Sequence, residues 1–193
     1  RLQRRERYTA IDCPAHPSRG HVMSAMTVRI LLAAALLAAA IAASAVEPGA
    51  VAPAFSLPSF ASAHPVSLAD YRGEVVLVDF WASWCSPCRQ SLPLYDKLRG
   101  EFSPADFAIL AIGLDENVAD ARSFLAEHQV KYMTLQNPQG DVAKAFGLTG
   151  MPSSYLIDRD GIVRARHIGF EPKDIVTLRH QIAVLIAKSA HAS

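Results

Sequence analysis

Residues 74–88 read EVVLVDFWASWCSPC, an apolar run followed by two cysteines. The run from Val75 to Trp81 is apolar except for Asp79, which is typical of a buried parallel strand. Cys85 and Cys88 follow where a helix pattern begins. Such a pair can close a small disulfide ring, or leave one thiol at the helix N-terminus, where the dipole and unpaired N–H groups favour thiolate. Because thiolates attack disulfides, the stretch predicts a dithiol–disulfide exchange site.

The same two cysteines have two plainer interpretations, a structural disulfide and one half of a zinc site. Zinc would need two further Cys or His ligands at tight spacing, and the neighbouring sequence does not supply them. Redox exchange is therefore the favoured interpretation, and no metal or other cofactor is expected.

Composition indicates one globular domain with an appendage. The chain has 193 residues, of which 51% are hydrophobic and 19% charged. Residues 1–45 contain six Lys or Arg and two Asp or Glu, so residues 46–193 contain 13 basic and 16 acidic side chains. No basic patch dominates the latter part, and nucleic acid is not expected as a partner.

The appendage has the pattern of a targeting segment over residues 23–45. A short basic region at residues 26–29 precedes an apolar, alanine-rich run, and Ala43-Ser44-Ala45 is a small-residue cleavage site. The competing interpretation is an uncleaved membrane anchor, because the apolar stretch of residues 30–46 reaches the lower limit for crossing a bilayer. Both predict that the domain at residues 46–193 works outside the cytoplasm.

Residues 1–22 resemble neither a signal nor a domain. They begin without methionine, are rich in arginine and contain Cys13. We expect an unstructured upstream extension, with translation starting at Met23 or Met26, so that Cys13 is absent from the working protein. A single remaining cysteine pair is too few for a small fold stapled by disulfides.

Beyond residue 46, strand and helix patterns alternate and end in a hairpin and a helix, which predicts a three-layer α/β domain with a mixed sheet. A hairpin turn is expected at residues 158–161. The expected strands cover residues 74–81, 107–114, 132–135, 154–157 and 162–168, with short strands and a turn within 48–72; the expected helices cover residues 87–99, 118–129, 140–146 and 175–188.

The segment at residues 79–88 resembles the active-site segment of thioredoxins, differing mainly at Ser83 and Ser86. Pro93 falls at the position of the proline that bends the thioredoxin helix, and Gly150-Met151-Pro152 resembles the cis-proline loop. The interval of 64 residues from Cys88 to Pro152 is longer than in plain thioredoxins and matches the inserted helix and strand of TlpA/ResA/DsbE-type periplasmic thioredoxins.

This resemblance covers about residues 50–187. Residues 53–58 resemble the N-terminal opening of these periplasmic proteins, and residues 65–68 resemble their entry to the sheet. It implies a thioredoxin fold, α/β/α in three layers around a mixed sheet, with an N-terminal β extension and a central helix–strand insertion. It also implies periplasmic localisation.

The resemblance implies a role for each site residue. Cys85 is expected to be the nucleophile and Cys88 the buried cysteine that resolves the mixed disulfide. Asp79 is the expected acceptor of the Cys88 proton, with a pKa raised by desolvation; the alternative is a strand-end carboxylate facing water. Pro152 is expected to be cis, so that the Met151 backbone can pair with an extended substrate. Trp84 is expected to offer apolar contact beside the thiol, or else to pack ordinarily.

Two positions depart from the resemblance. Many relatives carry a glutamate three residues after the second cysteine, where this chain has Ser91, and many have asparagine where Asp79 stands. Both departures weaken an assignment to cytochrome c maturation. Ser86 and Pro87 add no positive charge or imidazole beside the thiols, which favours a reductant over a strong oxidant.

The predicted function is reduction of protein disulfides outside the cytoplasm, in cytochrome c maturation or thiol homeostasis. Thiol- or disulfide-containing proteins are the expected substrates, and a membrane dithiol carrier is the expected electron donor. A disulfide oxidase or isomerase of the same fold is the first alternative. Copper delivery is another, although the histidines of residues 46–193, including His167, stand singly. A peroxiredoxin would need a single peroxidatic cysteine in another pattern, and a non-catalytic binding module would have no need of both cysteines.

Overall fold

The computed structural model describes residues 45–62 and 64–189. The upstream extension and nearly all of the targeting segment predicted from sequence therefore lie outside the described residues. Among the helices that are described, none has the length and apolarity required to cross a bilayer.

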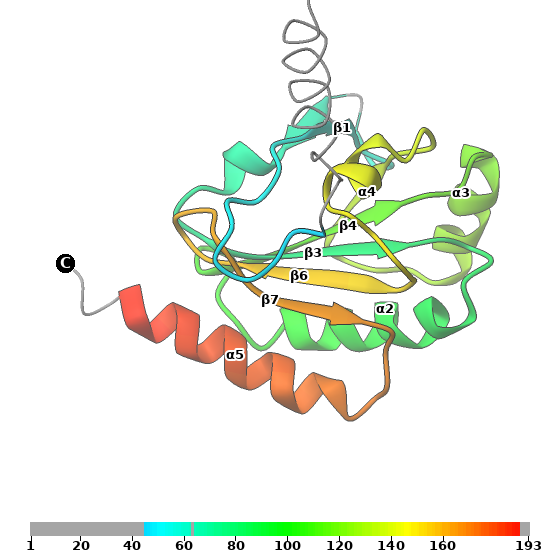
Figure 1. The fold of residues 1–193 in the computed structure, drawn as a ribbon. Coiled ribbons are helices and arrows are strands. Elements are labelled where there is room, and N and C mark those ends of the chain that lie inside the picture. Colours follow the sequence, from blue (N-terminus) through cyan, green and yellow to red (C-terminus); the bar gives the residue numbers. More distant parts are fainter. Residues whose placement is uncertain (1–44, 63, 190–193) are drawn as a thin grey trace, which may run out of the picture. The chain divides into compact units, whose positions relative to one another are not determined.

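A five-stranded mixed sheet forms the centre of the fold, in the order β5-β4-β3-β6-β7 (Figure 1). β3 (Val75–Trp81), β4 (Phe107–Gly113) and β5 (Met133–Gln136) run parallel to one another. β6 (Ser153–Ile157) and β7 (Val163–Ile168) are antiparallel to their neighbours. The mixed sheet predicted from the strand–helix alternation is confirmed.

Three helices pack on one face of this sheet. They are α2 (Ser86–Arg99), α3 (Val118–Glu127) and α5 (Asp174–Ser189), and their apolar side chains join one buried cluster with the strands. α3 and β5 form the predicted insertion. The helix ends at Glu127, two residues earlier than expected, because His128 leaves the helical region with φ −116° and ψ 69°.

The opposite face is covered by shorter elements. The hairpin of β1 (Ser56–Pro58) and β2 (Pro65–Ser67) is the predicted N-terminal β extension, and a 3₁₀ helix, η1 (Leu68–Tyr71), follows it. α4 (Asp141–Ala145) completes this layer (Figure 1). Together the two faces give the thioredoxin-like α/β/α arrangement.

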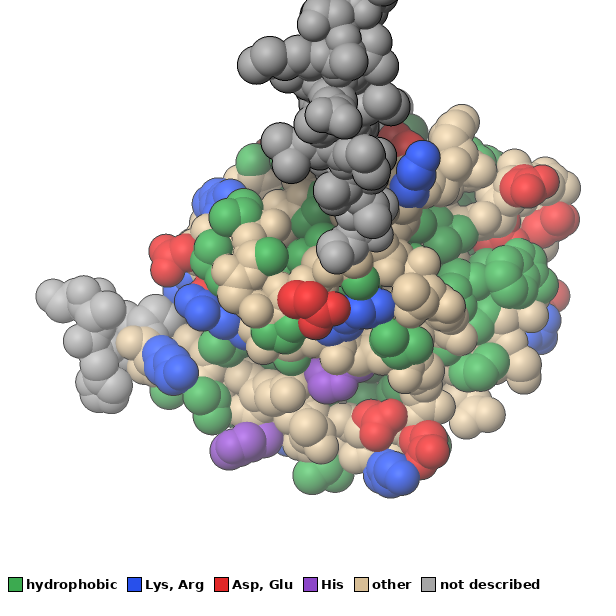
Figure 2. Space-filling model, in the orientation of Figure 1, with side chains coloured by type: hydrophobic (Ala, Val, Ile, Leu, Met, Phe, Trp, Pro, Cys, Tyr) green, Lys and Arg blue, Asp and Glu red, His purple; other side chains and the backbone are tan. Residues whose placement is uncertain are grey.

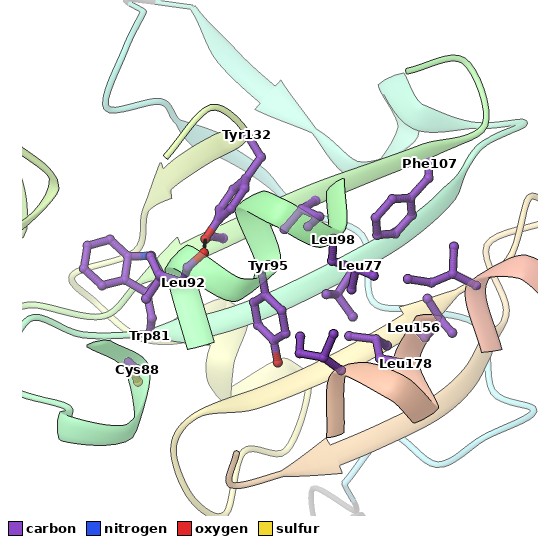
Figure 3. Close-up of a cluster of buried hydrophobic side chains, with 14 of the residues drawn as sticks. Leu77, Trp81, Cys88, Leu92, Tyr95, Leu98, Phe107, Tyr132, Leu156 and Leu178 are labelled. Atoms are coloured by element: carbon purple, nitrogen blue, oxygen red, sulfur yellow. Dashed lines mark hydrogen bonds between the residues drawn. The ribbon is translucent and has the colours of Figure 1, made fainter. Parts of the chain in front are cut away.

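Alternation along β3 divides its side chains between the two layers. Val76, Val78 and Phe80 belong to the cluster under α4, whereas Leu77 and Trp81 belong to the cluster under α2 and α5 (Figure 3). Because successive side chains on a strand point to opposite faces, Asp79 lies on the α2 side. The buried carboxyl group of Asp79 therefore points toward the layer that contains the cysteines.

An aromatic trio stabilises the α4 side. Phe146 lies edge-on to Phe80 and Tyr155, with centroid separations of 5.3 and 4.9 Å, and the Tyr155 hydroxyl donates to the Phe146 carbonyl over 2.9 Å. Aromatic pairs in this geometry add to the free energy gained from burial alone. Phe146 therefore connects α4 to the central strand.

Replacing Phe146 with alanine should lower the free energy of unfolding by about 3–5 kcal/mol, because the fully buried ring would leave a cavity in the layer. Val176→Ala is the matched control: that side chain is 66% exposed, and its loss should cost at most about 0.5 kcal/mol. Urea unfolding of the oxidised chain measures both, and equal costs for the two variants would contradict the assigned role.

Candidate active site

Cys85 and Cys88 form a disulfide at the N-terminus of α2. Cys85 is the N-cap, with extended backbone (φ −81°, ψ 103°), and the Cys88 N–H donates to the Cys85 carbonyl over 3.1 Å. Cys88 is fully buried and Cys85 is 5% exposed, so only Cys85 keeps contact with solvent. The predicted burial of Cys88 is confirmed. The first-turn N–H groups of α2 favour a thiolate at this position.

Asp79 lies in the middle of the buried sheet. Its side chain is fully buried, and neither carboxylate oxygen has a hydrogen-bond partner in the described part of the chain. Burial raises the pKa of Asp79 well above its usual range. The expected burial and raised pKa are confirmed, and the alternative of a carboxylate facing water is wrong. A carboxyl group in such surroundings can take up and release a proton closer to neutral pH.

Two tyrosines surround this carboxyl group on the α2 side. Burial, and then the Asp79 carboxylate, raise the pKa of both Tyr95 and Tyr132. The Tyr132 hydroxyl donates to the Leu92 carbonyl over 3.2 Å, within α2 and close to Pro93 (Figure 3). Neither tyrosine was predicted to lie near Asp79, because in the sequence each is one apolar position among many.

A buried aspartate anchors the loop that leads into the cysteines. Asp115, 4% exposed, accepts hydrogen bonds from the Ser83 backbone N–H at 3.0 and 3.2 Å and from the Ser83 hydroxyl. On the other side, Arg89 donates to the Ser83 carbonyl over 3.2 Å and lies 5.5 Å above the ring of Phe124. Asp115 and Arg89 therefore fix the loop at Ser83, two residues before Cys85, from opposite sides.

Sequence reasoning missed Asp115, although a signal for it exists. Asp115 is the first acidic residue after the predicted strand at residues 107–114, which is β4 in the structure, and β4 runs parallel to β3. Because parallel strands end at the same edge of a sheet, a polar side chain just beyond β4 meets the loop just beyond β3.

The predicted substrate-contact residues gather at the same edge. Ser153 pairs with Phe80 in the register of β3 and β6, so Met151 and Pro152 lie beside the end of β3. The Met151–Pro152 peptide is cis, as expected, and the Ser153 hydroxyl donates to the Gly150 carbonyl over 2.7 Å. Met151 packs against the cluster that contains both cysteines.

Trp84 projects from this edge into solvent. It is 69% exposed, so the interpretation as ordinary packing is wrong. Its ring borders a cleft of about 330 Å³, which is lined by Trp84, Leu114, Asp115, Glu116, Asn117 and Asp120. An exposed aromatic ring beside a cleft offers apolar contact to a segment docked there.

His167 does not join the cysteines. It lies on β7, and its Nε2 is 3.0 Å from Gln181 Oε1 on α5. Across residues 45–62 and 64–189, no three His, Cys, Asp or Glu side chains are grouped so that they could hold a metal ion.

Comparison with known proteins places the chain. The family described as AhpC/TSA matches residues 48–166, from before β1 into β7. The chain belongs to the AhpC/TSA family. Among solved structures, a candidate thiol:disulfide interchange protein DsbE from Chlorobium tepidum superposes with a TM-score of 0.71. It is 39% identical, and the match covers 74% of this chain and 99% of that one.

The curated relatives match this AhpC/TSA family member over only part of their own length. The thiol-disulfide oxidoreductase ResA of Bacillus thuringiensis is 28% identical over 56% of this chain and 63% of its own length. The thioredoxin-like protein YneN of Bacillus subtilis is 30% identical over 56% of this chain and 64% of its own. The chain thus spans just under two thirds of both relatives. The predicted resemblance to ResA- and DsbE-type proteins is confirmed.

Removing the Asp115 carboxylate should loosen the cysteine loop. Asp115→Ala leaves the half-buried Ser83 N–H without its acceptor, and we expect a loss of about 1–3 kcal/mol of unfolding free energy, with faster amide hydrogen exchange at Ser83. The exposed neighbour supplies the control, because Glu116→Ala should change neither quantity. Unchanged exchange at Ser83 in Asp115→Ala would show that the loop is held by other contacts.

The buried carboxyl group should make stability depend on pH. Because its folded pKa is raised, the contribution of Asp79 is fully present below about pH 4, where the unfolded side chain is protonated, and is lost as pH rises through the folded pKa. Asp79→Asn should therefore match the original chain near pH 4 and be more stable at alkaline pH, by about 2 kcal/mol.

Urea unfolding of the oxidised chain across this pH range measures the difference. Asp120→Asn, at an exposed position on α3, is the control and should follow the original chain at every pH. A constant offset between Asp79→Asn and the original chain from pH 4 upward would contradict the buried, titrating carboxyl group.

Proposed function

We propose that this chain is a thiol–disulfide oxidoreductase that reduces disulfides in other proteins. The observation that carries the proposal is the Cys85–Cys88 pair at the N-terminus of α2, on the sheet face that also carries the buried Asp79. The names of the ResA and DsbE relatives support the same chemistry. In the forward reaction the dithiol becomes a disulfide, and the client disulfide accepts its two electrons and becomes a dithiol.

Exposure and position assign the two cysteines different steps. Cys85 caps α2 and is the cysteine in contact with solvent, so its thiolate attacks the client and one client sulfur leaves. Cys88 is inside the first turn and fully buried, so it meets no client directly. It attacks the Cys85 sulfur of the mixed disulfide, which closes the Cys85–Cys88 bond and releases the second client thiolate.

Asp79 is the proposed acceptor of the Cys88 proton. Burial raises the pKa of a thiol, because the charged thiolate is unfavourable in apolar surroundings. Asp79 faces the α2 layer that contains Cys88, and its raised pKa brings the carboxyl group toward the range in which a base works at neutral pH. Proton transfer to Asp79 at the moment of attack avoids two buried negative charges.

An extended client segment fits the edge beside the cysteines. The backbone of Met151, next to Pro152, is the proposed pairing edge, and Trp84 supplies apolar contact over the adjoining cleft. Recognition that uses backbone groups tolerates many client sequences. On the face shown in Figure 2, acidic and basic side chains are interspersed among uncharged ones.

We assign the reducing direction from the residues between the cysteines. Ser86 and Pro87 place no cation beside the thiolate, so the reduced form lacks the added stabilisation of strong oxidants. The apolar, alanine-rich pattern of residues 30–45 supports a periplasmic location for the protein, either released by cleavage or tethered to the membrane.

A periplasmic reductant must have its own disulfide reduced again after each cycle, and a membrane dithiol carrier is the proposed electron donor. Oxidised apocytochromes c and other thiol proteins are the proposed clients.

The redox equilibrium of the full chain with glutathione tests the proposal. We expect a two-electron couple near the thioredoxin value, about −270 mV, rather than near the strongly oxidising value of about −120 mV. Cys88→Ser is the control: it should show no such couple and should retain clients on Cys85 as mixed disulfides.

Other results of the glutathione equilibrium would contradict the proposed function. A potential near the oxidising end would reverse the direction and make the protein a disulfide donor. If no reversible couple appears and purified chain carries copper, the oxidoreductase proposal fails in favour of metal delivery.

A further inference from the structure

A line of polar side chains crosses the apolar face of the sheet that packs against α2 and α5. Asp79 on β3 pairs in register with Ser154 on β6, and Ser154 pairs with His167 on the edge strand β7. Residues two positions away on the same strands, Leu77 and Leu156, belong to the hydrophobic cluster. Because alternate residues share a face, the three polar side chains lie in a row from the sheet centre to its edge.

Ser154 is the cross-strand neighbour of Asp79, although the two side chains are not hydrogen-bonded in this structure. Side chains directly opposite each other on antiparallel strands have Cβ atoms about 4.5–5.5 Å apart, within reach of a hydroxyl and a carboxylate. Ser154 is 2% exposed, and neither carboxylate oxygen of Asp79 has a hydrogen-bond partner among the described residues. A change of the Ser154 χ1 rotamer moves its hydroxyl oxygen, and in the rotamer that faces Asp79 the hydroxyl can donate to the carboxyl group or accept from it.

Tyr95 covers this row from α2. Its hydroxyl is hydrogen-bonded to the Ser154 side chain and points toward β6 and α5 (Figure 3). The ring is 3% exposed. Burial, and then the charge of Asp79, raise the pKa of Tyr95, so its hydroxyl stays protonated throughout the neutral range. A neutral hydroxyl passes a proton on by accepting one and donating another.

The outer end of the row opens toward solvent. A small cavity of about 10 Å³ is lined by Tyr95, Ser154, His167 and Asp174 among others, which is room for about one water molecule. His167 and Asp174 are half-buried. In the tautomer that donates from His167 Nε2 to the Gln181 oxygen, Nδ1 is the acceptor. An imidazole can accept a proton on one ring nitrogen while it donates from the other.

We propose that Ser154, Tyr95 and His167 form the route by which protons move between Asp79 and solvent. The inference rests on the proposed function, in which Asp79 accepts the Cys88 proton. In that step the Cys88 sulfur bonds to Cys85, the client thiolate leaves with the electron pair, and the proton moves to Asp79. Asp79 then passes the proton through Ser154 and Tyr95 to a cavity water and His167, and solvent receives it. The carboxylate is thereby restored for the next cycle.

Other ionisable groups near Asp79 are placed less well for this task. Tyr132, just before β5, feels the Asp79 charge, but its hydroxyl is directed at the Leu92 carbonyl. The cysteines of the α2 N-terminus bond to each other when oxidised, so they carry no proton in that state. Asp174 of α5 lines the same cavity as His167 and belongs to its outer end.

The experiment follows repeated release of client by the full chain, with a peptide disulfide and a small dithiol donor both in excess, so that every cycle requires a restored Asp79 carboxylate. At pH 7 we expect Ser154→Ala and Tyr95→Phe to slow release at least about tenfold, a modest share of what a general base contributes. His167→Ala should be slowed as well and restored by added imidazole buffer. The equilibrium with glutathione should stay unchanged in all three variants.

Tyr132→Phe is the matched control, because it removes a buried tyrosine hydroxyl that also feels Asp79 but lies outside the row. It should release client at the original rate, with the original pH profile. Equal slowing in Tyr132→Phe, or a glutathione equilibrium that shifts together with the rate, would overturn the route and indicate a structural effect.

Two further outcomes separate this inference from the proposed function. If Asp79→Asn slows release and the three row variants do not, Asp79 acts as proposed but its protons travel elsewhere, and the route is wrong. If Asp79→Asn releases client as fast as the original chain, the proposed role of Asp79 fails, and the route fails with it. No exchange with the peptide disulfide in the original chain would remove the oxidoreductase proposal itself.

Discussion

Burial of the central strand β3 on both faces is the constraint on which the rest of the structure depends. β3 is hydrogen-bonded to β4 on one edge and to β6 on the other, and all seven of its residues are buried. Its carboxyl end therefore has one position relative to both neighbours. The cysteines that follow β3, Asp115 beyond β4 and the Met151–Pro152 peptide before β6 meet at that end because pairing in the sheet brings them there.

The same burial imposes a cost at Asp79. A carboxylate at the centre of an apolar face is destabilising when ionised, and an apolar residue would pack there with less penalty. Active sites commonly retain such groups, since the surroundings that destabilise the charge also move the pKa toward the working range. The opposite face of β3 is packed with the Phe80, Phe146 and Tyr155 rings and, among the described residues, carries no such carboxyl group.

Much of the fold and part of the site could be predicted from local sequence. The apolar run of β3, the cysteine spacing at the start of α2 and the strand–helix alternation each depend on neighbours a few residues apart, where periodicity is informative. The predicted ends of helices and strands differ from the observed ends by only one or two residues, as at α3, which ends before His128. Asp115, Tyr95 and Ser154 were missed because each is unremarkable within its own segment, and His167 stood out only as a single histidine.

By itself the sequence determined the chemistry available to this protein, namely a dithiol at a helix N-terminus behind a strand that carries one carboxyl group. Tertiary structure alone decided which polar groups stand next to that chemistry. Ser154 and His167 reach the line of Asp79 through the registers of β3 with β6 and β6 with β7, across up to 88 residues of chain. Register is set by packing of both sheet faces, since a slip by one residue would turn every side chain to the wrong layer. No local pattern encodes that choice.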